Sequence, residues 1–285
     1  MSEHVAWSRL AHARASHLLR EAGVDHVVVK GPSTAALLGS ADRVSGDVDV
    51  LVRAAHLDRA REVLAAHGFR DAQAGMREGE LAAHSTELDD GRGPQVDLHR
   101  TFPGFGLEGE ALWRALAPYV TTADVAHAPV AVLAEPAALA VLALTAARAG
   151  EGSRVQADLR LTLGSAHWPA AVAFARETGA VDGVRAGLGL VDDAFAVSLG
   201  LPERVAAAWL VRRDGTSTVA AHLDDLVVLP WRERLRLLRA EALPSRAFMR
   251  VDYPGVPLWR AHARRWRRLA RELPGAIRTV VRARR

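Results

Sequence analysis

Cysteine is absent from the sequence, and its absence excludes several kinds of site. The chain can form no disulfide bridge, no thiolate nucleophile and no cysteine-ligated zinc centre. Sites built from carboxylates and histidines remain open to it. Hard cations that prefer oxygen ligands are therefore the natural metal candidates.

Long apolar segments are also lacking. The best candidate, residues 129–147, contains Glu135 and Pro136, so we expect no transmembrane segment. Residues 1–10 show no basic start followed by an apolar run, which a secretion signal would have. These features predict a cytoplasmic location.

Lysine is nearly absent, because Lys30 is the only lysine among the 37 lysines and arginines. The formal net charge is only +4, and the pI of about 10.4 reflects arginines that stay protonated to high pH. Ten of these arginines lie between Arg260 and Arg285, so the basic excess is C-terminal. A lone lysine in such a composition indicates a position that needs a compact ammonium group, with chance as the alternative.

Helices and strands alternate in the first part of the chain. Apolar spacing and glycine stop signals predict helices at residues 4–21, 33–38 and 54–67. Strands are predicted at residues 24–30, 47–52 and 69–72. The turn sequence Asp-Asp-Gly-Arg-Gly separates residues 81–88 from residues 95–100 and predicts an antiparallel hairpin.

Strand signals become rare after about residue 125, where alanine- and leucine-rich stretches such as 136–149 and 168–177 predict helices. We therefore predict an α/β (α+β) fold. Residues 1–125 would form a small mixed β-sheet core with flanking helices. Residues 126–285 would form a mainly helical domain that ends in a basic C-terminal helix.

Asp47, Asp49 and Asp97 are the candidate catalytic residues in the predicted strands. Successive side chains of a strand point to opposite faces, so Asp47 and Asp49 share one face and the intervening valines anchor the other. The same alternation places Asp97 and His99 on one face of the strand at residues 95–100. If the two strands are neighbours, three carboxylates converge, and such clustering is costly unless a cation neutralises it. The pattern therefore predicts a site for two divalent metal ions.

The segments beside these aspartates contain groups that bind anions. Gly31 lies at a strand-to-helix junction, where backbone amides can approach a phosphate, and Lys30 supplies a point charge. Arg43, Ser45 and Gly46 directly precede Asp47.

The sequence "VVVKG", followed by "RVSGDVDVLV" and later by "VDLH", resembles the uncharacterised nucleotidyltransferase family of the DNA polymerase β-like nucleotidyltransferase superfamily. The resemblance covers about residues 27–100 and implies that Asp47, Asp49 and Asp97 hold Mg²⁺ or Mn²⁺. A fainter similarity extends to the helix around Asp158. The superfamily usually has a serine directly after the glycine, whereas Pro32 stands there in this chain and Ser33 is the nearest serine.

The resemblance implies an enzyme that transfers a nucleoside monophosphate from a nucleoside triphosphate such as ATP to an acceptor hydroxyl, with release of pyrophosphate. The acceptor is a small molecule, a peptide or a protein. A catalytically degenerate nucleotide-binding or antitoxin-like regulatory module is the alternative. The intact set of three aspartates argues against it, since a non-catalytic descendant would not need clustered carboxylates.

Two features leave alternatives open. His99 is predicted to lie next to the site, where it assists Asp97 or contacts substrate, or else it caps the edge of the sheet. Trp259, Trp266 and Leu269 recur at helical spacing among the terminal arginines and predict an amphipathic helix. That helix packs on the body of the protein with a solvated basic face, or it contacts a membrane surface or nucleic acid. No recognised motif supports a nucleic-acid partner, but the sequence does not exclude one.

Overall fold

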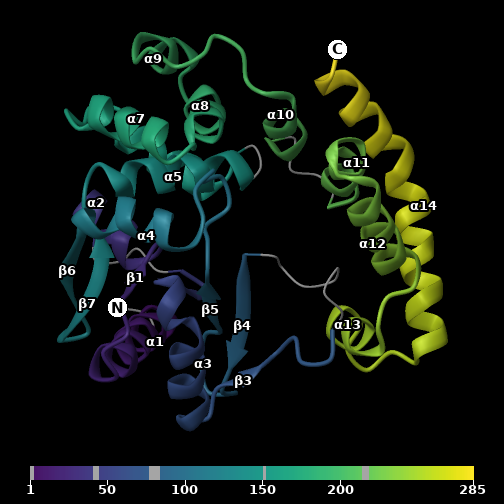
Figure 1. Cartoon of the computed structure of the whole chain (residues 1–285), viewed down its shortest axis with the longest axis horizontal. Coiled ribbons are helices and arrows are strands. Elements are labelled where there is room, and N and C mark those ends of the chain that lie inside the picture. Colours follow the sequence, from purple (N-terminus) through teal and green to yellow (C-terminus); the bar gives the residue numbers. More distant parts are fainter. Residues whose placement is uncertain (1–2, 41–44, 77–83, 150–151, 214–217) are drawn as a thin grey trace.

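A seven-stranded mixed β-sheet forms the centre of the computed structural model, which describes residues 3–40, 45–76, 84–149, 152–213 and 218–285 (Figure 1). The strands are β1 (His26–Val28), β2 (Val48–Val52), β3 (Arg70–Asp71), β4 (Ser85–Asp89), β5 (Val96–His99), β6 (Val120–Val125) and β7 (Ala128–Leu133). Their order in the sheet is β3-β4-β5-β2-β1-β7-β6. Strand β2 runs parallel to β5, and β1 runs parallel to β7, whereas the other neighbouring pairs are antiparallel. The predicted mixed α/β fold class is confirmed.

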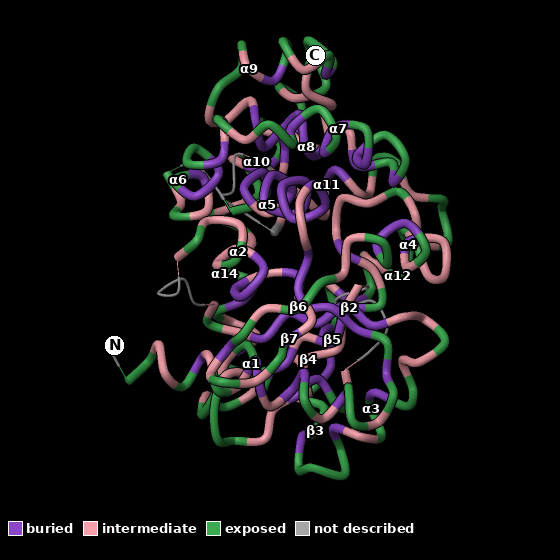
Figure 2. Tube along the Cα trace, turned by 90° about the vertical axis from the view of Figure 1, so that its left-hand side faces the viewer, coloured by how far each residue is buried: buried purple, intermediate pink, exposed green. Residues whose placement is uncertain are grey.

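Helices cover both faces of this sheet. In the first half of the chain they are α1 (Glu3–Glu21), α2 (Pro32–Leu38), α3 (Leu57–Ala66) and α4 (Gly109–Leu116), with 3-10 turns η1 (Ala54–His56) and η3 (Ala117–Tyr119). Val48, Val50 and Val52 pack with residues of α1 and α3 in one apolar cluster. Leu51, from the same strand, joins a second cluster that includes α5 (Ala137–Arg148). The alternation of β2 therefore supplies both cores, and buried residues follow the sheet and α5 in Figure 2.

Helix α5 is the centre of the second core. All but two of its residues are buried, because alanines let neighbouring helices approach closely. Glycine is required where α8 (Val181–Gly189) crosses it, since a Cβ added at Gly187 would lie 2.1 Å from the carbonyl oxygen of Ala143. The remaining helices of this region are α6 (Arg154–Leu161), α7 (Trp168–Glu177) and α9 (Asp193–Ser198).

The C-terminal helices form a small apolar cluster of their own, made of Val211, Ala220, Ala276 and Val280. Figure 1 shows the last helix, in yellow, running along the edge of the molecule beside α11 and α12. Arg265 on that helix donates to Glu241 at 2.5 Å and ties it to α12. The elements here are α10 (Ala207–Arg213), α11 (Thr218–Val228), α12 (Trp231–Ala242), α13 (Arg246–Asp252) and α14 (Leu258–Ala283).

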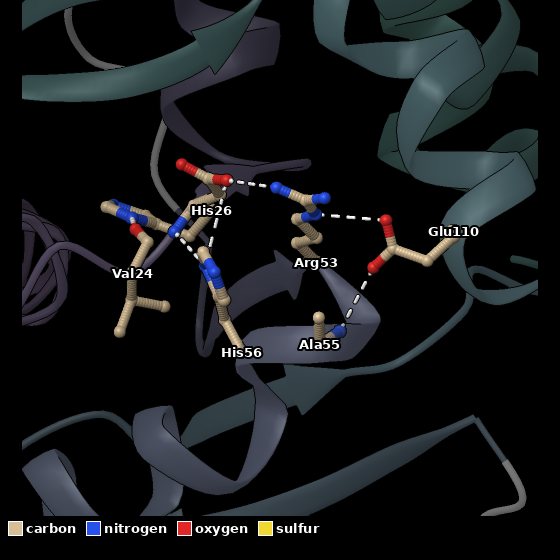
Figure 3. Close-up of polar contacts among 7 residues, drawn as sticks. Val24, His26, Arg53, Ala55, His56 and Glu110 are labelled. Atoms are coloured by element: carbon tan, nitrogen blue, oxygen red, sulfur yellow. Dashed lines mark hydrogen bonds and ion pairs between the residues drawn. The ribbon is translucent and has the colours of Figure 1, made fainter.

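A polar network holds the end of β2 against α4. Arg53 donates to Glu110 at 2.9 Å and to Asp25 at 3.2 Å, and Glu110 also accepts the amide of Ala55 (Figure 3). The nearby ring of His56 accepts the amide of Asp25. Since these groups are largely exposed, the network fixes the turn into α3 more than it stabilises the fold.

The predicted hairpin is confirmed where the chain is described, because β4 pairs with β5, whereas residues 81–83 of that prediction lie outside the described residues. The hairpin of β6 and β7 was not predicted, and its second strand lies beyond residue 125. The sheet thus continues to Leu133, while the division into domains at residues 125 and 126 stays a prediction. Among the described helices, none has the length and apolar character that crossing a bilayer requires.

Candidate active site

The parallel pairing of β2 and β5 brings two of the predicted aspartates together. Asp49 stands opposite Asp97, and Leu51 stands opposite His99 in the register of the two strands. Ligand atoms of Asp49, Asp97 and His99 all lie within 4.8 Å of one another. The apolar residues between them, Val48, Val50, Val96 and Leu98, are buried on the other face of the sheet, as the alternation predicted.

Asp49 is fully buried and is the most highly connected carboxylate of this group. Its Oδ1 accepts a hydrogen bond from Lys30 Nζ at 2.5 Å and another from His99 Nε2 at 2.9 Å. Burial alone would raise the pKa of Asp49, but the hydrogen bond from His99 and the charge of Lys30 outweigh it and lower the pKa to about 2. Asp49 is therefore ionised, with its charge partly compensated by the only lysine in the chain.

Asp97 lies in the opposite electrostatic situation. Burial and the neighbouring negative charge of Asp49 raise the pKa of Asp97 to about 6, although His99 acts in the other direction. Among the described residues, Asp97 has no hydrogen-bonded cation of the kind that Lys30 provides for Asp49. A bound cation would stabilise the ionised form of a carboxylate in such surroundings.

Asp47 lies outside the close cluster, just before the first residue of β2. Its Oδ1 accepts a hydrogen bond from the hydroxyl of Ser45 at 2.6 Å, and its charge contributes to the raised pKa of Asp97. Ser45 is itself held by Ser8 of α1, whose hydroxyl donates to the Ser45 carbonyl at 2.9 Å. The structure thus places Asp47 near the other two aspartates but orients it through Ser45.

The Gly31 junction is tightly packed. Gly31 has a φ of +51°, and a Cβ added there would lie 2.9 Å from Nε2 of His12 on α1. His12 is buried, and burial lowers its pKa, so it is neutral near pH 7; its Nε2 has no hydrogen-bond partner among the described residues. Sequence reasoning missed His12, because its position depends on how α1 packs against the sheet.

The other predicted anion-binding residues have different surroundings. The hydroxyl of Ser33 is buried, donates to the Val28 carbonyl and accepts the amide of Leu133 at 2.9 Å, so it joins α2 to the sheet. Gly46 is exposed beside Asp47. Arg43 lies outside the described residues.

His99 is buried and stacks on His84 with ring centroids 5.5 Å apart. Because an ionised carboxylate can only accept, Nε2 of His99 must carry the hydrogen of the bond to Asp49. Its Nδ1 is buried and has no partner among the described residues. The predicted place of His99 beside the site agrees with this geometry, and its contact is with Asp49 rather than with Asp97.

A cavity of about 130 Å³ lies beside Lys30, the partner of Asp49, and reaches the helical half. Lys30, Gly31 and Ser45 line its sheet side, and Thr145, Arg154 and Asp158 are among the residues from α5 and α6 that line its other side. The sequence singled out Asp158 but gave no sign that Arg154 faces Lys30.

Arg148, at the end of α5, is a further cation that sequence reasoning missed. The residue as a whole is exposed, but its guanidinium is partly buried, and this burial lowers the pKa of Arg148. The positive charge of Arg212 lowers the pKa further, whereas the negative charge of Asp49 raises it. His84 also experiences the charge of Arg148. Among the described residues, no hydrogen bond or ion pair engages the Arg148 side chain, so it can bind an anionic substrate.

The residues present fit a divalent cation. Oδ2 of Asp49 is buried and has no hydrogen-bond partner among the described residues, and an unpaired buried carboxylate oxygen is costly unless a cation or donor satisfies it. The ligand atoms of Asp49 and Asp97 lie within 4.8 Å of each other, and ligand oxygens on opposite sides of Mg²⁺ stand about 4.2 Å apart. The carboxylate oxygens of this cluster are the ligands that such ions prefer.

Similarity to known proteins identifies the family of the chain. A solved structure that resembles the chain is that of an antigenic nucleotidyltransferase-like protein from Paracoccidioides brasiliensis, at 15% identity and a TM-score of 0.37. The match covers 65% of this chain and 94% of that one, and it is too distant to carry an argument about function. Among curated proteins there is no significant match. The model of the family described as uncharacterised nucleotidyltransferase matches residues 10–196, which include Asp47, Asp49, Asp97 and His99, and the chain belongs to this family.

Proposed function

We propose that the protein transfers a nucleoside monophosphate from a nucleoside triphosphate to a hydroxyl group of an acceptor and releases pyrophosphate. The observation that carries this proposal is the pairing of Asp49 with Asp97 across two parallel strands, with one buried oxygen of Asp49 unpaired. Membership of a nucleotidyltransferase family supports the same chemistry.

Asp47, Asp49 and Asp97 are the residues that would hold Mg²⁺ or Mn²⁺. Such ions, when bound, neutralise charge on the triphosphate and on the attacking oxygen. The acceptor oxygen forms a bond to the α-phosphorus while the bond from that phosphorus to the bridging oxygen of the leaving pyrophosphate breaks. Asp97 would take the proton of the acceptor hydroxyl, and His99 would position Asp49 through the hydrogen bond to its Oδ1.

The nucleotide would lie along the segments on either side of β2. Lys30 keeps a partly exposed side chain that lines the cavity, and the backbone at Gly31 and Gly46 offers amides to the phosphates. Ser45 orients Asp47, Arg43 remains a proposed phosphate contact from the sequence, and Ser33 supports the start of α2. Arg148 faces the same region from the helical half and would bind the outer phosphates.

An experiment with labelled nucleoside triphosphates tests whether the protein transfers a nucleotidyl group. The protein is incubated with magnesium, a lysate of its own cell and nucleoside triphosphates labelled either at the α- or at the γ-phosphate. The proposal expects an acceptor that gains the α-label only, and an Asp97→Asn variant that labels nothing.

Transfer of the γ-label would show phosphoryl transfer instead and contradict the proposal. Nucleotide binding without any labelled product or pyrophosphate would favour the non-catalytic regulatory alternative. Running each common nucleoside triphosphate in parallel also identifies the preferred base.

A further inference from the structure

Helix α14 exposes a continuous row of large apolar side chains. The exposed fractions are 69% for Trp259, 50% for Trp266, 41% for Leu273, 47% for Ile277 and 45% for Val281. A helix turns about 100° per residue, so these side chains fall within a narrow stripe that is about 33 Å long. We call these five residues the apolar stripe of α14.

The stripe is distinct from the face that packs on the protein. Ala261, Arg265, Ala276 and Val280 are the buried residues of α14, and they lie about 60 to 160° around the helix from the middle of the stripe. Two of them belong to the C-terminal apolar cluster. The stripe is therefore not needed to dock α14 and has no described neighbour that covers it.

A basic face borders the stripe on its other side. Arg260, Arg267, Arg271 and Arg278 lie about 80 to 120° from it, and Arg260 stacks over the ring of Trp259 at 4.9 Å. Helix α14 contains eight arginines and a single acidic residue, Glu272. The neighbouring helix α12 also exposes apolar residues, but there Glu233 pairs with Arg236 and makes the charge mixed. The surface along α14 complements a partner that is both apolar and negatively charged.

We propose that α14 lies on the surface of a membrane that contains anionic lipids, with its apolar stripe in the interface and its arginines at the headgroups. Tryptophan and leucine on one face with arginine beside them are the composition of interfacial helices. Arginine side chains reach phosphate groups while their stems cover apolar surface. This inference is independent of the proposed nucleotidyl transfer.

Two other partners fit the surface less well. Nucleic-acid bases stack on aromatic rings, but Leu273, Ile277 and Val281 have no such ring and would gain little from bases. A second copy of the chain would bring two arginine-rich faces together, and like charges oppose that contact.

Vesicle sedimentation with the full-length protein tests the proposal. One set of vesicles contains phosphatidylcholine alone, and the other contains equal parts of phosphatidylcholine and phosphatidylglycerol. We expect binding to the anionic vesicles at least about tenfold tighter than to the neutral ones, with the difference reduced at high salt.

Matched variants separate the stripe from other exposed apolar groups. Leu273→Ser with Ile277→Ser, and Trp266→Ser alone, should weaken binding about tenfold, because each removes apolar area from the interface. The control is Trp7→Ser on α1, where the exposed fraction of 52% is close to that of Trp266. Circular dichroism should show unchanged helix content in all of them, since the side chains are exposed.

Equal binding to both vesicle types, or equal losses in the Trp266 and Trp7 variants, would overturn the proposal. So would a homodimer in solution that the Leu273 and Ile277 changes dissociate. Binding of nucleic acid that Arg267→Gln, Arg271→Gln and Arg278→Gln abolish, without any vesicle binding, would assign the helix to that partner instead.

Discussion

Lys30, two residues after β1, and Asp49, the second residue of β2, form a hydrogen-bonded ion pair 2.5 Å long. Asp49 is fully buried, and Lys30 is the only lysine among the 37 basic residues. The pair compensates part of the charge of a carboxylate that is buried in the sheet. It also means that the expected repulsion among the aspartates falls on Asp97, whose pKa is raised to about 6, rather than on Asp49.

Lys30→Met should destabilise the fold, because it leaves the charge of Asp49 buried without its cation. We expect a loss of about 1 to 3 kcal/mol in the free energy of unfolding, below the range for fully buried pairs since Lys30 is partly exposed. Urea unfolding measures the change. The same substitution in an Asp49→Asn background should cost much less, and an equal cost in both backgrounds would show that the pair contributes nothing.

The sequence predicted the parts of the site that depend on strand alternation and chain order. Asp49 and Asp97 could be placed on one face because Val48, Val50, Val96 and Leu98 had to occupy the other. The ion pair of Lys30 was not predictable, since an isolated "VVVKG" pattern assigns the lysine equally well to a phosphate. Alternation alone also could not show that Leu51, on the same face of β2 as Asp49, packs in a second core with α5, or that Asp49 and His99 are buried.

His12 and Arg148 could not be predicted from the sequence, because their positions depend on how helices pack on the sheet. His12 approaches Gly31, and Arg148 approaches Asp49, only because α1 and α5 pack on opposite faces of the sheet. Neither residue lies in a motif. The strand β7 was missed because "APVAVL" reads as a buried apolar run that fits a strand or the start of α5.

Arg148→Ala should raise KM for the nucleoside triphosphate about tenfold, since it removes a charge-assisted contact to phosphate. The proposed function underlies this prediction. The turnover number should change little, because the reacting groups remain in place. Arg160→Ala, at an exposed position of α6, is the control in steady-state kinetics. Unchanged KM for the Arg148 variant would remove this residue from the nucleotide site.

His26 should make folding stability depend on pH. Burial lowers its pKa in the folded protein, where Nδ1 donates to the Val24 carbonyl and Nε2 accepts the Ser16 hydroxyl. Below about pH 6.5, His26 binds a proton in the unfolded chain but stays neutral in the folded protein. The free energy of unfolding therefore falls as the pH is lowered from about 6.5 towards the lowered pKa of His26 in the folded protein.

His26→Gln can keep both hydrogen bonds but does not titrate. Both proteins lose free energy of unfolding between pH 8 and pH 5. We expect this loss to be about 1 kcal/mol smaller in the variant than in the wild type. His12 retains its share of the pH dependence in both proteins. Parallel stability curves for the two proteins between pH 8 and pH 5 would show that His26 is not kept neutral by the fold.

Magnesium-dependent release of pyrophosphate in the Asp97→Asn variant tests the central claim most directly. The amide preserves the shape of the side chain but removes the charge that holds the cation. Asp58→Asn, an exposed change in the first turn of α3, controls for the loss of a carboxylate elsewhere. We predict pyrophosphate release with magnesium or manganese in the wild type and in Asp58→Asn, and none above background in Asp97→Asn, with similar melting temperatures for the three proteins. Substantial release by a folded Asp97→Asn variant would contradict the account and place the chemistry elsewhere.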